Sequence, residues 1–210
     1  MQLWHALTSP FARKAVIAMR ELDLQGVVQL VEVNPWTDQR LRRLNPLSKV
    51  PTLVRPDGPP LMESAVICEY FDASAAAGRL FRLFPPSGEA RWRALRLQAL
   101  ADGMATAATR LHADERRAPF ERSQVMMARF REAMEAALSE LEREVPGLTG
   151  EAPTIGEISI AAALGYLEFR WPERHWGTGR QGLVTWFAAF RNRDSMTACE
   201  HRLPVQAQPH

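Results

Sequence analysis

The chain has 210 residues, enough for one large domain or two small ones, and a chain of this length buries roughly 70% of its unfolded surface. A core of that size needs neither disulfides nor a metal. Hydrophobic residues make up 46% and charged residues 24%, as in ordinary globular proteins, and a net charge of +2 gives no reason to expect a nucleic-acid partner.

The cysteine, histidine and apolar patterns exclude further classes. Cys68 and Cys199 are far apart and no signal-like leader is present, so we expect free thiols in a cytoplasmic protein. The five histidines lack metal-ligand spacing, so no metal is expected. No apolar run approaches the ~18 residues of a spanning helix, which predicts no membrane partner.

The first third of the chain alternates between strand and helix patterns. Residues 2–7 predict a strand, residues 9–22 a helix with one apolar face, and residues 27–33 a β-branched strand. Strand, helix and strand within about 30 residues form a βαβ unit with parallel strands. Residues 34–45 are a polar connection with room for a helical turn.

A hairpin and a helix follow. Residues 50–54 predict a strand that opens on a proline, residues 56–58 a turn, and residues 60–62 a second strand. Ser64 is expected to cap a helix that runs through residue 72. The order βαβ and then ββα is that of a thioredoxin-like domain, which we place at residues 1–78.

The remainder of the chain is helical in pattern. Two prolines mark residues 84–88 as a linker. Strand signals are absent after it, and four segments have helical periodicity: 89–113, 119–145, 154–169 and 183–192. We therefore expect an α/β domain followed by an all-α domain over residues 86–210.

Ser9, Pro10 and Ala12 have the shape of a redox turn that lacks its sulfur atoms. Ser9 stands where a thioredoxin-like fold carries its first active-site cysteine, and Ala12 where it carries the second. Read alone, Ser9 is a helix cap followed by proline at the first helical position. The two interpretations are compatible, because a helix N-terminus favours an anion and the serine hydroxyl can donate to a bound thiolate. The thiol would then arrive with a cofactor.

Two further motifs are predicted to face the same cleft. In a thioredoxin-like domain Pro51 faces the active-site helix, and a cis bond would present the backbone of Val50 to an extended peptide. Glu63 can take an ammonium, while the Ser64 hydroxyl and first-turn N–H groups take a carboxylate. In isolation these motifs are an ordinary strand start and an ordinary helix start. Together they describe a pocket for a short peptide with a thiol, a free amine and free carboxylates.

Thr154 and Glu157 form a fourth motif, a capping box before the apolar run 158–167. We interpret this box as structural.

These motifs resemble the cytosolic glutathione transferases, in particular bacterial members with a Ser- or Cys-type active site. The resemblance covers essentially the whole chain, and it implies the glutathione transferase fold. Glu157 stands where that family usually has aspartate. The segments that carry the resemblance are TSPFARK, SKVPTL, MESAVICEYFD and PTIGEISIAAALGYLEFR.

The resemblance implies that Ser9 holds the glutathione thiol as thiolate, with Thr8 open as the alternative. A tyrosine-type site is disfavoured, because the only tyrosines, Tyr70 and Tyr166, lie inside later predicted helices.

For the rest of the peptide, the resemblance implies that Val50 pairs with the cysteinyl backbone beside a cis Pro51. Glu63 and Ser64 would hold the γ-glutamyl end, and Lys49 would reach the glycine carboxylate.

The expected function is a bacterial detoxification enzyme that adds glutathione to a hydrophobic electrophile. Met104 and Trp171 are candidates for the electrophile wall, although the core is the ordinary place for such residues. The resemblance also implies a homodimer. The alternatives are glutathione-dependent peroxide reduction and a binding or regulatory protein without turnover.

Overall fold

The computed structural model describes residues 1–75, 81–148 and 152–203. The predicted boundary at residue 78 and the chain end at residue 210 lie outside these residues. Two compact units are formed, one by Met1–Leu83 with the C-terminal segment from Asp194, the other by Phe84–Arg193. The sequence analysis placed that C-terminal segment in the helical domain, whereas in the structure it packs with the first unit.

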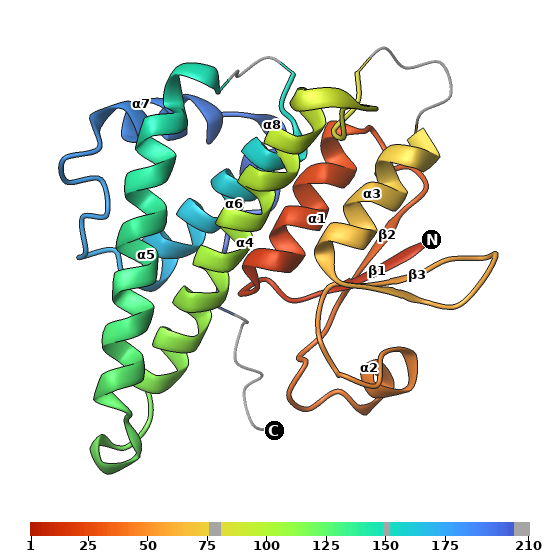
Figure 1. The fold of residues 1–210 in the computed structure, drawn as a ribbon. Coiled ribbons are helices and arrows are strands. Elements are labelled where there is room, and N and C mark those ends of the chain that lie inside the picture. Colours follow the sequence, from red (N-terminus) through yellow and green to blue (C-terminus); the bar gives the residue numbers. More distant parts are fainter. Residues whose placement is uncertain (76–80, 149–151, 204–210) are drawn as a thin grey trace. The chain divides into compact units, whose positions relative to one another are not determined.

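The first unit contains a four-stranded sheet with the strand order β2-β1-β3-β4. Strand β1 pairs with β2 in parallel and β3 pairs with β4 antiparallel, as the βαβ and hairpin patterns predict, and β1 also pairs with β3 antiparallel (Figure 1). The strands are β1 (Gln2–His5), β2 (Gln29–Glu32), β3 (Thr52–Val54) and β4 (Leu61–Met62). The helices of this unit are α1 (Pro10–Glu21), α2 (Gln39–Leu44), α3 (Ser64–Ala75) and α8 (Asp194–Thr197).

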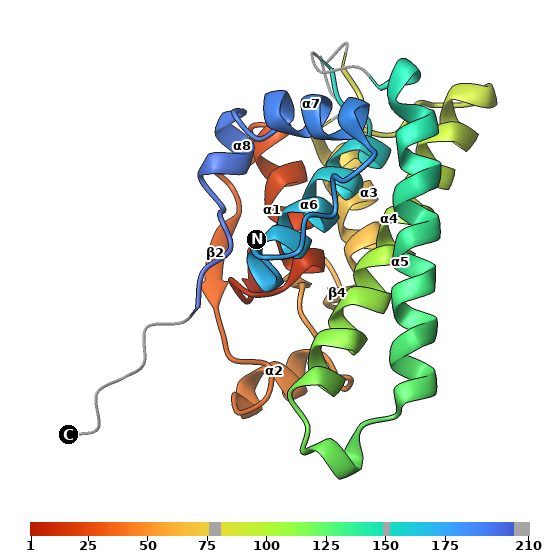
Figure 2. The ribbon, with the colours of Figure 1, turned by 90° about the vertical axis from the view of Figure 1, so that its left-hand side faces the viewer.

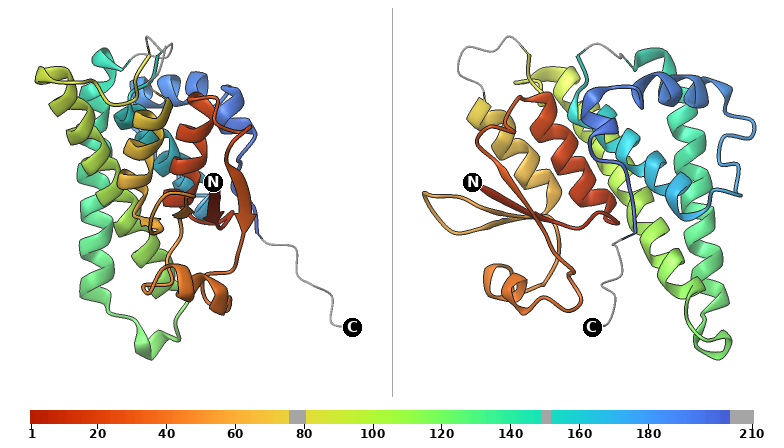
Figure 3. Two further views of the ribbon diagram at one scale, coloured as in Figure 1. Left: turned by 90° about the vertical axis from the view of Figure 1, so that its right-hand side faces the viewer. Right: turned by 180° about the vertical axis from the view of Figure 1, so that it is seen from behind.

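Helices cover both faces of this sheet. Alternate side chains of a strand point to opposite faces, so Leu3 and Trp4 on β1 enter two different cores. Leu3 is fully buried, and α1 and α3 pack against each other on one face of the sheet (Figure 3). On the other face Trp4 packs with Val33 and with Leu41 of α2. The apolar positions therefore fix which face each helix covers.

The second unit is helical, as its sequence pattern predicts (Figure 2). Its long helices are α4 (Gly88–Glu115), α5 (Gln124–Glu144), α6 (Ile155–Arg170) and α7 (Gln181–Phe190). The helix predicted over 119–145 instead begins at Gln124, because Ser123 caps it by accepting a hydrogen bond from the Met126 N–H at 3.4 Å. Two short 3-10 helices flank α5, Pro119–Glu121 and Val145–Gly147.

Helix α6 is the central element of the second unit. All of its residues from Ile155 to Leu167 are buried, so it is apolar on every side rather than amphipathic. Gly156 allows its close approach to α4, because a Cβ atom there would lie 2.8 Å from the Cβ of Leu97 and 2.9 Å from the carbonyl oxygen of Ala94.

The C-terminal segment returns to helix α1 of the first unit. Helix α8, which the sequence analysis did not predict, packs on α1, and the Ser195 hydroxyl donates a hydrogen bond to the Glu21 carboxylate. Further along, the His201 ring contacts the Leu7 carbonyl oxygen through Nδ1 at 2.9 Å. These contacts fix the path of the segment beside the β1–α1 turn.

Candidate functional site

Ser9 connects the end of β1 to helix α1 as the N-cap. Its backbone is extended, and its Oγ accepts a hydrogen bond from the Ala12 N–H at 3.2 Å. Pro10 follows at the first helical position, where a missing N–H costs nothing. In this bond the serine acts only as acceptor, so the hydroxyl proton stays available to a ligand. Ser9 is half-buried.

The turn before β3 carries Lys49, Val50 and Pro51, and the Val50–Pro51 peptide bond is cis. The buried Asn45 side chain donates to the Lys49 carbonyl oxygen and to the Thr52 Oγ1, both at 3.0 Å. The Thr52 hydroxyl in turn donates to the same carbonyl oxygen at 2.8 Å. Two polar side chains therefore hold this turn from beneath, and sequence reasoning missed both. A polar residue in a loop gives no signal that its side chain turns inward.

The β4–α3 turn carries Glu63 and Ser64. Glu63 has φ 67°, in the left-handed region that non-glycine residues seldom adopt, and its side chain is exposed. Its carbonyl oxygen accepts from the Ile67 N–H at 3.0 Å, so the predicted cap position shifts by one residue. Ser64 is not the cap but the first residue of α3, and it is buried. Its position still leaves the first-turn N–H groups without intrahelical partners.

Strand register brings these turns to one end of the sheet. Thr52 on β3 pairs with Trp4 on β1 and with Met62 on β4. Pro51 and Glu63 lie one residue beyond the paired Trp4, Thr52 and Met62, at the end of the sheet where β1 also leads into the Ser9 turn. All of the candidate residues in the first unit therefore lie at this end of the sheet, and Lys49 and Glu63 are exposed there.

The two candidates for the electrophile wall lie in the second unit. Met104 on α4 is only 2% exposed, and Trp171, which ends α6, is 9% exposed. The Trp171 Nε1–H donates to the Glu115 carboxylate at 2.7 Å, and its ring meets the His112 ring edge-on at 5.9 Å. Burial raises the pKa of Glu115, but the hydrogen bonds from Trp171 and from nearby arginines outweigh it and leave the pKa below its usual value.

The predicted capping-box residues begin helix α6. The Thr154 N–H donates to Glu157 Oε2 at 2.7 Å, and the Glu157 side chain is 2% exposed. This glutamate satisfies a backbone donor that the helix itself cannot reach.

The fold has the features of the glutathione transferases: a mixed four-stranded sheet, a serine-capped first helix, a cis-proline turn at the same end of the sheet, and a helical unit that follows. The chain belongs to the glutathione S-transferase family: the family's N-terminal domain matches residues 8–74 and its C-terminal domain matches residues 124–189.

Several relatives resemble the chain over nearly its whole length. An uncharacterized GST-like protein, YibF of Escherichia coli, is 30% identical, and the match covers 95% of this chain and 98% of the relative. A Pseudomonas fluorescens glutathione transferase family member solved with bound glutathione has a TM-score of 0.89 and 33% identity, covering 96% and 99% of the two chains. A Methylobacterium radiotolerans glutathione S-transferase in complex with glutathione sulfonate has a TM-score of 0.87 and 28% identity, covering 100% and 99%.

Two further features concern metals and membranes. Within residues 1–75, 81–148 and 152–203, no three His, Cys, Asp or Glu side chains are grouped so that they could hold a metal ion. Within the same ranges, none of the helices combines the length and the apolar character needed to cross a membrane.

Proposed function

We propose that this protein is a glutathione transferase in which Ser9 activates the glutathione thiol. The observation that carries this proposal is the strand register: the Ser9 turn, the Pro51 turn and the Glu63 turn lie at the same end of the sheet. The glutathione bound in the Pseudomonas fluorescens relative supports the choice of peptide.

The remaining residues at this end of the sheet can bind the backbone, the ammonium and the carboxylates of glutathione. The main chain of Val50, next to Pro51, would pair with the cysteinyl backbone as an added strand. The exposed Glu63 carboxylate would take the γ-glutamyl ammonium, and Ser64 with the first-turn N–H groups of α3 would take its carboxylate. The exposed Lys49 would reach the glycine carboxylate.

Ser9 would act by stabilising the thiolate. A free thiol with a pKa near ~8.5 is only a few per cent ionised at pH 7, and lowering that pKa by two units requires ~2.7 kcal/mol. The Ser9 hydroxyl supplies a hydrogen bond to a charged acceptor, and the N-terminus of α1 adds a favourable dipole. Thr8 precedes Ser9 and is the alternative donor. The thiol proton is released to solvent. The thiolate electron pair then forms the new C–S bond while the electrophilic carbon gives up a π bond or a leaving group, which departs with its own electron pair. Positioning is the main further requirement.

The second substrate in this proposal is an apolar electrophile. Met104 and Trp171 are the residues of the helical unit proposed for its wall. Variants that shorten either side chain should raise the KM for the electrophile and leave the KM for glutathione unchanged. We also propose that the enzyme works as a homodimer in the cytoplasm of a bacterium, in detoxification.

The test is the thiol pKa of bound glutathione, measured by thiolate absorbance in the wild type, Ser9→Ala and Thr8→Ala. The proposal expects a pKa well below that of free glutathione in the wild type and in Thr8→Ala, and a return toward the free value in Ser9→Ala. A depressed pKa that survives in Ser9→Ala but not in Thr8→Ala would move the role to Thr8. Binding with an unshifted pKa in the wild type would overturn the transferase proposal in favour of a glutathione-binding protein without turnover.

A further inference from the structure

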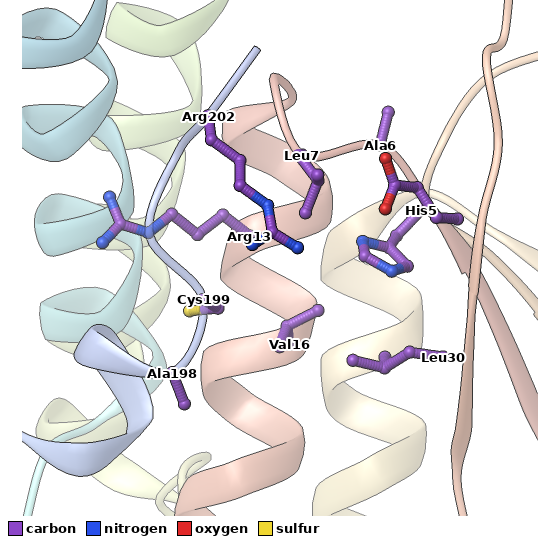
Figure 4. Close-up of a pocket in the computed structure, with 10 residues that line it drawn as sticks. His5, Ala6, Leu7, Arg13, Val16, Leu30, Ala198, Cys199 and Arg202 are labelled. Carbon is purple, nitrogen blue, oxygen red and sulfur yellow. The ribbon is translucent and has the colours of Figure 1, made fainter. Parts of the chain in front are cut away.

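A second feature of the first unit is a pocket of about 270 Å³ (Figure 4). Its walls come from helix α1, the strands β1 and β2, the turn between β1 and α1, and the C-terminal segment after α8. None of Ser9, Lys49, Val50, Glu63 or Ser64 lines it. The proposed transferase reaction therefore leaves this pocket without a role.

The C-terminal wall of the pocket is held in place by α1. The Arg13 guanidinium donates from Nη2 to the Met196 carbonyl oxygen at 3.3 Å, and the Cys199 thiol donates to the Ser195 carbonyl oxygen at 2.9 Å. Burial raises the pKa of the Cys199 thiol despite the opposing effect of Arg13, so this cysteine is a neutral wall residue at pH 7.

The sheet wall carries a carboxylate. Glu32 on β2 pairs in parallel register with His5 on β1, so their side chains share the face that looks into the pocket. The pKa of His5 lies below its usual value, chiefly because the ring is buried. Glu32 opposes this shift, and Arg202 adds to it. The imidazole is therefore neutral at pH 7, and Glu32 provides the only negative charge in the pocket lining.

The other side of the pocket carries arginines. Figure 4 shows Arg202, from the C-terminal segment, across the pocket from His5, whereas the guanidinium of Arg13, from α1, points away from His5. Glu32 and Arg202 line the same pocket and both are exposed, yet neither forms a salt bridge with any residue in the described parts of the chain. The Nε of Arg13 is buried and donates no hydrogen bond within those parts. Opposite charges thus line one space.

Apolar side chains complete the lining. In Figure 4, Val16, Leu30 and Ala198 all lie below the level of His5 and Arg202, spread across the view. At about 30 Å³ per water molecule, the 270 Å³ of the pocket corresponds to about nine waters. A small molecule of the size of leucine therefore fits within it.

We propose that this pocket binds a free α-amino acid with an apolar side chain, of about the size of leucine. Its carboxylate pairs with Arg202, and its ammonium pairs with Glu32. Its side chain packs on Val16 and Leu30. An anion alone would leave Glu32 without a partner, and a cation alone would leave Arg202 without one, so the zwitterion matches the lining best.

The test is isothermal titration of the full chain, saturated with glutathione, with L-leucine, 4-methylpentanoate and 3-methylbutylamine. The last two lack the amine and the carboxylate respectively. We expect leucine to bind, and each analogue to bind at least tenfold more weakly. Arg202→Gln and Glu32→Gln should each weaken leucine binding at least tenfold. The matched surface variants Arg110→Gln and Glu173→Gln should leave it unchanged.

Four results would overturn the proposal: no leucine binding to the wild type, equal binding by either analogue, unchanged affinity in both pocket variants, or competition between leucine and glutathione. Both pocket variants alter exposed side chains, and circular dichroism would check that they remain folded. The glutathione pKa experiment does not involve this pocket, so the two proposals fail independently.

Discussion

The Asn45 side-chain amide donates a hydrogen bond to the Lys49 carbonyl oxygen at 3.0 Å, from a position that is only 1% exposed. The same amide group bonds the Thr52 hydroxyl, so one buried side chain ties the turn before β3 to the strand itself. The turn that we propose for glutathione binding therefore depends on a residue that need not touch glutathione.

Replacing Asn45 by alanine should damage both the fold and the site. The Lys49 carbonyl oxygen and the Thr52 hydroxyl each lose a donor. The Leu47 N–H loses its acceptor, the Asn45 Oδ1 at 3.0 Å. Each lost hydrogen bond costs about 0.5–1.5 kcal/mol net, or about 1.5–4.5 kcal/mol for the three. We expect Asn45→Ala to lower the free energy of unfolding by about that amount and to weaken glutathione binding, measured by urea denaturation and by titration. Asn34→Ala is the control, because Asn34 also accepts a hydrogen bond from a nearby backbone N–H but is exposed. Equal losses in the two variants would contradict the prediction.

The two roles assigned to Ser9 can be separated by Ser9→Asp. Aspartate caps helices as well as serine does, so the unfolding free energy should stay near that of the wild type, whereas Ser9→Ala should lose about 0.5–2 kcal/mol. The aspartate carboxylate has no proton to donate at pH 7 and repels a thiolate. We expect Ser9→Asp to be stable but to bind glutathione with an unlowered thiol pKa. A stable Ser9→Asp variant with wild-type turnover would show that Ser9 only caps the helix.

Glu157 should be required for the stability of the helical unit. In Glu157→Ala the Thr154 N–H loses its acceptor at 2.7 Å and a cavity replaces a buried side chain, so we expect a loss of about 1–3 kcal/mol. Glu157→Gln keeps an amide oxygen at the same reach and should recover part of this loss. Thermal unfolding of both variants provides the measurement. A glutamine variant no more stable than the alanine variant would show that the carboxylate charge, not the acceptor, matters.

The stability of the protein should rise with pH as His5 loses its proton in the unfolded chain. Burial lowers the pKa of His5 in the folded protein, so between that lowered pKa and the usual value of 6.5 the unfolded state binds more protons. Stability is then greatest above pH 6.5 and falls as the pH drops through this window. His5→Gln should show a flatter dependence of the melting temperature between pH 5 and 8.

His112 contributes to this pH dependence with the same sign, since burial, with Arg170 and Arg116 nearby, also lowers its pKa. The double variant His5→Gln/His112→Gln should therefore be flatter than either single variant. A single His5→Gln variant with the full wild-type slope would contradict the assignment to His5.

Local patterns in the sequence predicted most of the fold. The parallel β1–β2 pair followed from the spacing of a short apolar run and a β-branched run around one helix, and α6 from its capping box and apolar run. Helix α8 escaped prediction because four residues hold too little periodicity to signal a helix. The return of its segment to α1 depends on contacts such as Ser195 with Glu21, which are distant in sequence.

The candidate site was predictable only in part. Ser9, Pro51 and Glu63 each occupy a helix or strand boundary, where turn chemistry is visible in the sequence. The shift of the cap from Ser64 to Glu63 was not, because it depends on the left-handed backbone of Glu63. The inward-facing amide of Asn45 was not visible either, since most asparagines in polar loops point to solvent.

The contact between Ser195 and Glu21 also has a consequence for folding during synthesis on the ribosome. The two residues are 174 positions apart, so at 5–20 residues per second the ribosome needs about 10 s or more to synthesise the partner of Glu21. Throughout that interval one side of α1 lacks its covering, and for most of it all four strands of the sheet have already been synthesised. The first unit begins to form first and is completed last, after the entire helical unit has been translated.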